Sequence, residues 1–386
     1  MMPIFEHGGE LEKLERLGIS PENLIDFSVN LNPLGPPEEL LRTLRERISE
    51  IALYPEPRSE ALVAKLSEKL KVPRGNLVVS NGSNQLIYAV YRALRPGRVL
   101  ILQPTFSEYR KAAALCGTYV IDFVLSPEDG FSVPLEELHK ALESSDLAFI
   151  CNPNNPTGSL LERELLLALV RRFPDTTFVV DEAFSDFSDV PSSVVGNVLE
   201  FENLVVLRSF TKIFSIPGLR LGYAAAGENV ASALREQIEP WSVNRLSQLA
   251  GEIVLEFERF VEQTRGFISE ERDFLFSGIS KVEGLSPFPS HANFLLVRCE
   301  ALGASSLQAR LLEKGIFVRD CSNFVGLDGH FFRVAVRKRE ENERLISALS
   351  EVADGSESPH GPGHGLARRQ EPDNHCIVQD ILSGRI

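Results

Sequence analysis

The sequence predicts an α/β protein in which a large domain, built on a mostly parallel sheet, is followed by a smaller α+β domain. Between residues 76 and 226, short apolar runs rich in Val, Leu and Ile alternate with runs whose apolar residues recur at helical spacing. This alternation is typical of a parallel sheet with helices on both faces. After residue 281, three more strand-like runs alternate with two helical ones, which predicts the second unit.

The N-terminal residues 1–37 are predicted to form an arm. A short helical pattern at 11–17 precedes an extended run that prolines and glycine interrupt. In the next stretch, 38–51, the apolar residues recur at helical spacing, so a helix is expected there.

The large domain is expected to contain at least six buried strands. We place them at 77–80, 99–102, 147–151, 178–180, 205–207 and 221–225. Helical patterns lie between several of them, as at 84–94 and 160–172, and the striped stretch 244–280 predicts one or two long connecting helices.

The C-terminal part is expected to form the smaller domain and to associate with the N-terminal segment. Its predicted strands are 294–299, 316–319 and 331–336, and its predicted helices are 304–314 and 339–352. The chain therefore divides into an arm (1–37), a large domain with the connecting helices (38–280), a small domain (281–352) and a tail (353–386).

The tail is rich in glycine and proline, which predicts a flexible segment. Its three histidines, His360, His364 and His375, have a spacing that only weakly favours a metal site. We expect no metal ion in the protein.

Composition excludes several classes of function. Lys and Arg total 40 and Asp and Glu total 54, so the net charge is −14, which argues against non-specific nucleic-acid binding. No apolar run approaches the about 18 residues that a membrane span needs. The first ten residues lack the features of a secretory signal. The five cysteines are widely spread without a CxxC pair, which favours reduced thiols and a cytoplasmic location.

Polar segments follow the expected strands, at the positions where ligands bind in open α/β sheets. Residues 81–84 (NGSN) start a helix, whose free N–H groups and dipole favour an anion, although Ser and Asn also cap helices for structural reasons alone. Residues 152–158 (NPNNPTG) form a dense turn-forming run. Asp181 and Glu182 end a hydrophobic strand, where a buried carboxylate must pair with a cation or face a site.

The segment 209–222 is the most informative. It places Lys212 beside Ser209 and Thr211, with Arg220 eight residues later. A lysine that forms a Schiff base needs a lowered pKa and a rigid position, whereas a phosphate needs hydroxyls and a guanidinium. One loop that supplies both would hold a phosphorylated aldehyde cofactor.

Together these segments resemble the fold-type I pyridoxal-phosphate enzymes of the aminotransferase class I/II group, over roughly residues 5–350. The resemblance implies a large domain with a mostly parallel seven-stranded sheet, pyridoxal 5'-phosphate as cofactor, and a homodimer with shared active sites. It also implies that Lys212 forms the Schiff base, that Asp181 pairs with the ring nitrogen and keeps it protonated, and that Asn155 bonds the ring hydroxyl.

The same resemblance implies the remaining cofactor contacts. The phosphate is expected at Ser83, Asn84, Ser209, Thr211 and Arg220, the ring face on Phe106, and Tyr54 is expected to reach the phosphate from the neighbouring subunit. The chain departs from the pattern at Phe184, where many aminotransferases carry a tyrosine that bonds the ring oxygen. Asn155 would then be the main partner of that oxygen.

Within the group the chain resembles two families, the threonine-phosphate decarboxylases of cobalamin biosynthesis and the histidinol-phosphate aminotransferases. The segments 7–9 (HGG), 26–35 (DFSVNLNPLG), 181–184 (DEAF) and 319–324 (RDCSNF) favour the first. That family implies decarboxylation of L-threonine O-3-phosphate to (R)-1-amino-2-propanol O-2-phosphate. The alternative is transamination of a phosphorylated amine with 2-oxoglutarate.

The resemblance also implies residues for a substrate that carries a carboxylate and a phosphate. Arg333 is expected at the carboxylate, and Arg319, Arg337, His7 and Asn32 are expected at the phosphate. Arg319 and Arg337 have an alternative role as partners of surface acids.

Two functions of other classes remain as alternatives at this point. A metal-dependent hydrolase would use Asp181, Glu182 and Asp186, but no second cluster of ligands accompanies them. A non-catalytic protein that only keeps the fold would be expected to lack Lys212 or Asp181, and both are present.

Overall fold

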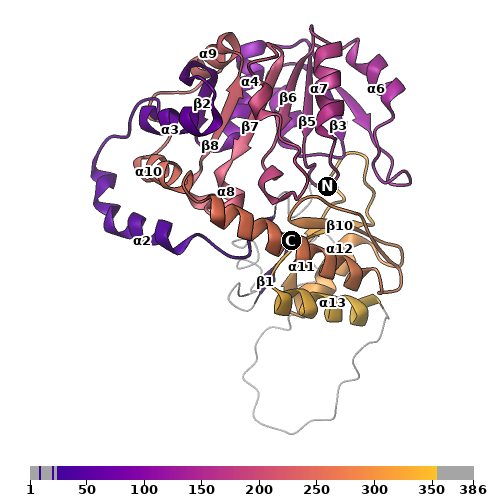
Figure 1. The fold of residues 1–386 in the computed structure, drawn as a ribbon. Coiled ribbons are helices and arrows are strands. Elements are labelled where there is room, and N and C mark those ends of the chain that lie inside the picture. The colour runs from indigo at the N-terminus through magenta and orange to yellow at the C-terminus, as the bar shows by residue number, and fades with distance from the viewer. Residues whose placement is uncertain (1–7, 10–19, 21–23, 354–386) are drawn as a thin grey trace, which may run out of the picture.

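The computed structural model describes residues 8, 9, 20 and 24–353. The large domain contains a seven-stranded sheet (Figure 1). Its strands are β2 (Leu77–Ser80), β3 (Arg98–Gln103), β4 (Tyr119–Val124), β5 (Leu147–Cys151), β6 (Thr177–Asp181), β7 (Leu204–Ser209) and β8 (Gly222–Ala226). They lie in the order β2-β8-β7-β6-β5-β3-β4, and only β8 runs antiparallel to its neighbours. The predicted mostly parallel sheet of seven strands is confirmed.

Helices cover both faces of this sheet. The helices of the large domain are α2 (Glu38–Glu46), which contacts α10 rather than the sheet, α3 (Glu60–Leu70), α4 (Ser83–Leu94), α5 (Glu108–Leu115), α6 (Leu135–Leu142), α7 (Arg163–Arg172), α8 (Phe210–Ile213), α9 (Glu228–Glu236) and α10 (Arg245–Val254). Short 3-10 turns occur at η2 (Ile48–Ala52), η3 (Arg74–Asn76), η4 (Ser185–Phe187), η5 (Val195–Asn197) and η6 (Pro217–Leu219).

Alternate residues of each strand belong to two separate cores. On β3, Leu100 belongs to a cluster with residues of α3, α6, α7 and α10. Its neighbour Ile101 belongs to a second cluster with residues of α4, α5 and α9. Successive side chains of a strand point to opposite faces, so a strand buried on both faces needs a continuous apolar run. Such continuous apolar runs are the pattern from which the central strands were predicted.

The smaller domain contains an antiparallel sheet in the order β12-β13-β10-β9. Its elements are β9 (Leu285–Pro287), β10 (Phe294–Cys299), β12 (Arg319–Asp320), β13 (Phe331–Ala335), α12 (Ala304–Glu313) and α13 (Arg339–Ala353). The long helix α11 (Glu258–Ile279) contacts α13, β9 and β10, and it also contacts η4 of the large domain. It therefore joins the two domains.

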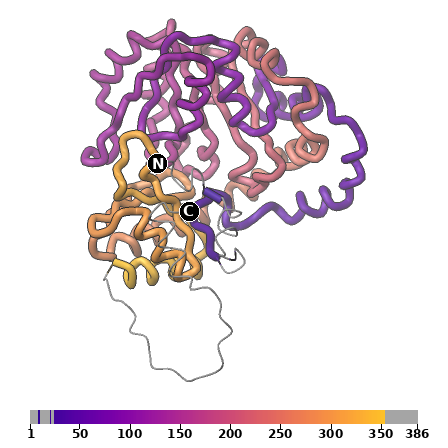
Figure 2. Tube along the Cα trace, turned by 180° about the vertical axis from the view of Figure 1, so that it is seen from behind, coloured from indigo at the N-terminus to yellow at the C-terminus, as the bar shows by residue number. Residues whose placement is uncertain are grey.

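The arm is tied to the smaller domain by a two-residue parallel pairing. β1 (Ile25–Asp26) pairs with β11 (Ile316–Phe317). Seen from behind, the chain that follows β1 runs from the smaller domain to the outer side of the large one (Figure 2). The expected association of the two chain ends is thus present. Residues 11–17 and the tail after residue 353, with its histidines, lie outside the described residues.

Two expected elements differ from the structure, and a third left two possibilities open. The strand expected at 316–319 is two short strands, β11 and β12, which belong to different sheets. The helix expected at 38–51 ends at Glu46, and η2 follows it. The stretch 244–280 forms two helices, α10 and α11, in agreement with one of the two readings. Within the described residues, no helix is both long enough and apolar enough to cross a membrane.

Candidate active site

The carboxyl ends of three parallel strands face one cavity of about 760 Å³. β5, β6 and β7 end at Cys151, Asp181 and Ser209, and all three residues line this cavity. The smaller domain contributes Arg319 and Arg333, which are paired across β12 and β13. The cavity therefore lies between the two domains, at the strand ends where the polar segments of the sequence converge.

Lys212 lies on α8, the single helical turn after β7, and its half-buried side chain lines the cavity. The pKa of its amine is lowered to about 8, chiefly by burial and then by the positive charges of Arg333 and Arg220. Asp181 acts on that pKa in the opposite direction. A lysine in this environment supplies a neutral amine close to neutral pH, as a Schiff base requires.

Asp181 is buried at the end of β6 and accepts two hydrogen bonds. The hydroxyl of Tyr109 donates to Oδ2 at 2.8 Å, and the backbone N–H of Ala183 donates to Oδ1 at 3.0 Å. Burial raises the pKa of this carboxyl to about 6, whereas the two hydrogen bonds act to lower it. The carboxylate can thus remain ionised at neutral pH and pair with a cationic ring nitrogen.

The start of α4 and the segment after β7 form a cradle for a phosphate. Ser83 and Asn84 are the first residues of α4, and both line the cavity with Arg220. Gly82 has φ 79°, and a Cβ there would lie 2.5 Å from Nη2 of Arg220. A side chain at position 82 would therefore displace this guanidinium from the helix start.

Two hydroxyls complete this cradle. Ser209 and Thr211 both line the cavity, and their side-chain oxygens lie 2.8 Å apart. Free N–H groups at a helix start, two hydroxyls and a guanidinium together match a phosphate group.

Asn155, Phe106 and Phe184 line the same cavity. Oδ1 of Asn155 accepts a hydrogen bond from Nη1 of Arg333, so a predicted cofactor residue and a predicted substrate residue are in direct contact. The ring of Phe184 stands edge-on to another ring, that of Phe294, with centroids 5.1 Å apart.

Two predicted substrate residues lie away from the cavity. Nδ2 of Asn32 donates to the carbonyl of Ile213 at 2.7 Å and to the hydroxyl of Thr264 at 2.9 Å. The guanidinium of Arg337 donates to Glu341 at 2.7 Å and to the carbonyl of Asp26 at 3.0 Å. Neither residue lines the cavity, so these contacts correspond to the structural alternative for Arg337 and to a structural role for Asn32.

Arg319 and Arg333 are buried in the cavity wall. Nη2 of Arg319 donates to Oδ1 of Asn323 at 2.8 Å, and Nη2 of Arg333 donates to the carbonyl of Ser28 at 2.8 Å. Burial lowers the pKa of Arg333 to about 10, and the charge of Arg319 contributes in the same direction.

Tyr54 is 89% exposed and its ring lies 6.2 Å from that of Trp241. It does not line the cavity of its own chain, so its predicted role across a subunit boundary stays a prediction. His7 lies outside the described residues.

Asn30, Tyr109 and Asn323 are among the cavity-lining residues that sequence reasoning missed. Asn30 is buried, and its Oδ1 has no hydrogen-bond partner in the described part of the chain. Asn32, two residues later, is also buried but does not line the cavity, because its side-chain amide is bonded to Ile213 and Thr264. Tyr109 lies in α5, where an aromatic residue resembles a core residue.

Two of the three acids that a metal-dependent hydrolase would use, Glu182 and Asp186, are paired with an arginine. Arg208 donates to Oε2 of Glu182 at 2.8 Å and to Oδ1 of Asp186 at 2.6 Å. Among the described residues, no group of three His, Cys, Asp or Glu side chains could hold a metal ion.

A model of the family described as "Aminotransferase class I and II" matches residues 22–349. The chain belongs to this family. The cofactor of the family is pyridoxal 5'-phosphate, and the residues of the cavity fit it: an amine, a carboxylate for the ring nitrogen and a phosphate cradle occur together.

Named relatives carry two different activities. The chain is 38% identical, over 90% of its length and 97% of the relative, to a threonine-phosphate decarboxylase of Salmonella typhimurium. Its structure matches a histidinol-phosphate aminotransferase from Clostridium acetobutylicum with TM-score 0.81 and 29% identity, over 86% of this chain and 100% of that one. It matches an L-threonine-O-3-phosphate decarboxylase from Porphyromonas gingivalis with TM-score 0.78 and 29% identity, over 85% and 99% of the two chains. The fold alone therefore does not separate the two reactions.

Proposed function

We propose that this aminotransferase-family protein decarboxylates L-threonine O-3-phosphate to (R)-1-amino-2-propanol O-2-phosphate, a step of cobalamin biosynthesis, in the cytoplasm. The 38% identity to the Salmonella typhimurium decarboxylase supports this choice. The second candidate is transamination of a phosphorylated amine with 2-oxoglutarate, which the likeness to the histidinol-phosphate aminotransferase favours.

The observation that carries the proposal is the pair of arginines in the cavity wall. Arg319 and Arg333 face each other across two antiparallel strands, and both are buried. Two guanidiniums side by side in the wall of a cavity form a locally positive site that attracts anionic groups. A substrate with a carboxylate at one end and a phosphate at the other supplies those anions, with the carboxylate at Arg333 and the phosphate at Arg319.

Each residue that lines the cavity has a role that follows from its position. Bound pyridoxal 5'-phosphate supplies a cationic ring that accepts the electron pair left at Cα. Lys212 holds or accepts a proton at its amine, and Asp181 offers its carboxylate to the ring nitrogen. Arg333 and Arg319 hold the two ends of the substrate and so decide which bond of Cα is presented for cleavage, a matter of orientation.

One experiment separates the two reactions. The cofactor-loaded protein is incubated with L-threonine O-3-phosphate, and released CO₂ is measured. It is then given histidinol phosphate and 2-oxoglutarate, and glutamate is measured. We expect CO₂ in the first reaction and little glutamate in the second. Glutamate without CO₂ would reverse the assignment, and Lys212→Ala serves as the inactive control.

We also propose that the protein acts as a homodimer. Large apolar side chains gather in the segment from η2 to Tyr54: Ile48 is 53% exposed, Ile51 68% and Leu53 60%. Trp241, beside Tyr54, is 53% exposed. A second copy of the chain would cover this surface and would bring Tyr54 to the partner's cofactor phosphate.

A further inference from the structure

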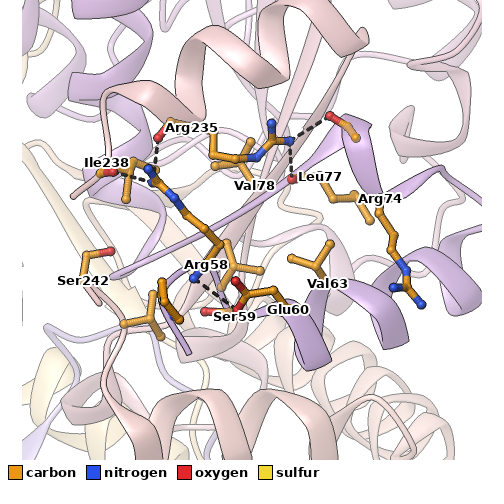
Figure 3. Close-up of a pocket in the computed structure, with 14 residues that line it drawn as sticks. Arg58, Ser59, Glu60, Val63, Arg74, Leu77, Val78, Arg235, Ile238 and Ser242 are labelled. Atoms are coloured by element: carbon orange, nitrogen blue, oxygen red, sulfur yellow. Dashed lines mark hydrogen bonds between the residues drawn. The ribbon is translucent and has the colours of Figure 1, made fainter. Parts of the chain in front are cut away.

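A second cavity, of about 290 Å³, lies at the outer edge of the large sheet. One wall is β2, a strand at the edge of the sheet, which pairs only with β8 in the described structure. α3, η3, the end of α9 and the loop before α10 complete the lining (Figure 3). None of its lining residues belongs to the active-site cavity.

The floor of this second cavity is apolar. Leu77 and Val78 of β2, with Ile238 and Val243, are buried side chains that line it, and the half-buried Val63 of α3 joins them. Small-molecule sites combine an apolar lining with a few polar groups and have volumes of about 300–1,000 Å³. This cavity has that character at the small end of the range.

Three arginines, Arg58, Arg74 and Arg235, line the same cavity. Within the described residues none of them pairs with a carboxylate. Glu60 is the one acid in the lining, so the charged lining residues sum to 3 − 1 = +2 in a chain whose net charge is −14. Positive charge therefore exceeds negative charge in this lining.

Two of these guanidiniums are held in fixed positions by backbone carbonyls. Nη1 of Arg58 donates to the carbonyls of Arg235 and Ile238 at 2.8 and 2.6 Å. Nη2 of Arg235 donates to the carbonyls of Gly75 and Leu77 at 2.9 and 3.3 Å. Figure 3 shows these bonds, with Arg74 on the opposite side of Val63 in that view. Fixed guanidiniums lose little freedom when they bind an anion, which favours affinity.

We propose that this cavity binds a small amphipathic anion, a molecule with one carboxylate or phosphate group and a compact apolar body. The apolar floor takes the body, and the arginines take the anionic group through paired N–H donors. The site is separate from the catalytic cavity and does not depend on which reaction that cavity performs.

The test is a calorimetric titration of the cofactor-loaded protein with three probes of the same size: 3-phenylpropionate, phenyl phosphate and 3-phenylpropan-1-ol. We expect saturable binding of at least one anion and at least tenfold weaker binding of the alcohol, which corresponds to about 1.4 kcal/mol. The first two probes distinguish a carboxylate ligand from a phosphate ligand. L-Threonine O-3-phosphate present in excess should leave the binding unchanged.

Variants locate the binding. Val63→Phe fills the cavity and should weaken binding of the anion at least tenfold. Arg74→Gln, at an exposed position, should weaken it about two- to fivefold, as for an exposed ion pair. Arg42→Gln, a surface arginine of α2, is the matched control and should bind as the unchanged protein does. Absence of saturable binding, or equal affinity in all three variants, would overturn the proposal.

Discussion

The hydrogen bond between Tyr109 and Asp181 sets the electrostatics of the predicted ring-nitrogen site. Asp181 is buried, and burial favours the neutral acid, whereas the hydroxyl of Tyr109 favours the carboxylate. The ring of Tyr109 is held by stacking on Phe149, with centroids 4.7 Å apart. The hydroxyl is therefore fixed in place before any cofactor binds.

Tyr109→Phe should raise the pKa of Asp181 above about 6, because it removes a hydrogen bond that lowers this pKa. The acid limb of the pH–activity profile should move to higher pH, and kcat at neutral pH should fall by about ten- to a hundredfold, as for a hydrogen bond to a charged group. The measurement is kcat against pH. Tyr91→Phe is the control, since its hydroxyl donates to the backbone carbonyl of Tyr109 and not to the carboxylate. A profile that does not move would contradict this role of Tyr109.

The amine of Lys212 should govern how fast the protein takes up its cofactor. Only the neutral amine attacks an aldehyde, and its pKa is lowered to about 8. The uptake rate of the cofactor-free protein should thus rise about tenfold per pH unit and level off above about pH 8.

The position of that midpoint depends on Arg333, whose charge lowers the pKa of Lys212. Arg333→Gln should raise this pKa, so the midpoint should move to higher pH. Arg337→Gln should leave it in place, because Arg337 is paired with Glu341 outside the cavity. Stopped-flow absorbance of pyridoxal phosphate uptake gives both midpoints, and equal midpoints in the two variants would refute the assignment.

Sequence reasoning identified site residues where the chemistry resides in one local segment. Lys212, Ser209, Thr211 and Arg220 fall within one loop, and the structure brings them to one cavity. It did not separate Asn30 from Asn32, because residues two apart in an extended run point to the same face. Only the structure shows that the amide of Asn32 is bonded to Ile213 and Thr264. The spacing of four residues between Arg337 and Glu341 is compatible with an ion pair, but only the fold shows that Arg337 lies outside the cavity that Arg319 lines.

At the scale of elements, the strands that are buried on both faces are the ones that could be predicted from the sequence. The central strands β5 and β6 are buried on both faces and were readable as continuous apolar runs. β4 lies at the edge of the sheet and is only partly buried, so its residues gave no clear pattern. The pairing of β1 with β11 joins residues almost 300 positions apart, and two-residue strands carry no periodicity that a sequence could display.

The start of α4 makes a prediction at the same scale. Gly82→Ala should lower the affinity for pyridoxal phosphate at least tenfold, because its Cβ would displace the guanidinium of Arg220. Gly35→Ala is a matched control, with φ 77° and no atom within 4 Å of the new Cβ. Both variants should lose about 1 kcal/mol of unfolding free energy through backbone strain. Fluorescence titration with the cofactor and thermal unfolding measure the two effects. Similar cofactor affinities in both variants would show that the close approach to Arg220 is unimportant.

At the scale of the whole molecule, the proposed homodimer would cover the exposed apolar surface around Tyr54. Exposed patches of this kind on otherwise polar proteins mark association sites. Replacing Ile51, at 68% exposure, by Asp should shift the protein from dimer toward monomer with little change in folding. Sedimentation velocity measures this shift, and a protein that sediments as a monomer without the substitution would refute the homodimer.

Shared active sites make a sharper prediction. Lys212→Ala removes the amine of one subunit, and Tyr54→Phe removes the hydroxyl expected to reach the phosphate of the other. If Tyr54 acts across the subunit boundary, a heterodimer of the two variants keeps one complete site, with Lys212 from one chain and Tyr54 from its partner. Mixed subunits should then be more active than either variant alone. If Tyr54 acts within its own chain, the heterodimer has no complete site and mixing restores nothing. Activity per subunit, measured before and after the two variants are exchanged, decides between these arrangements.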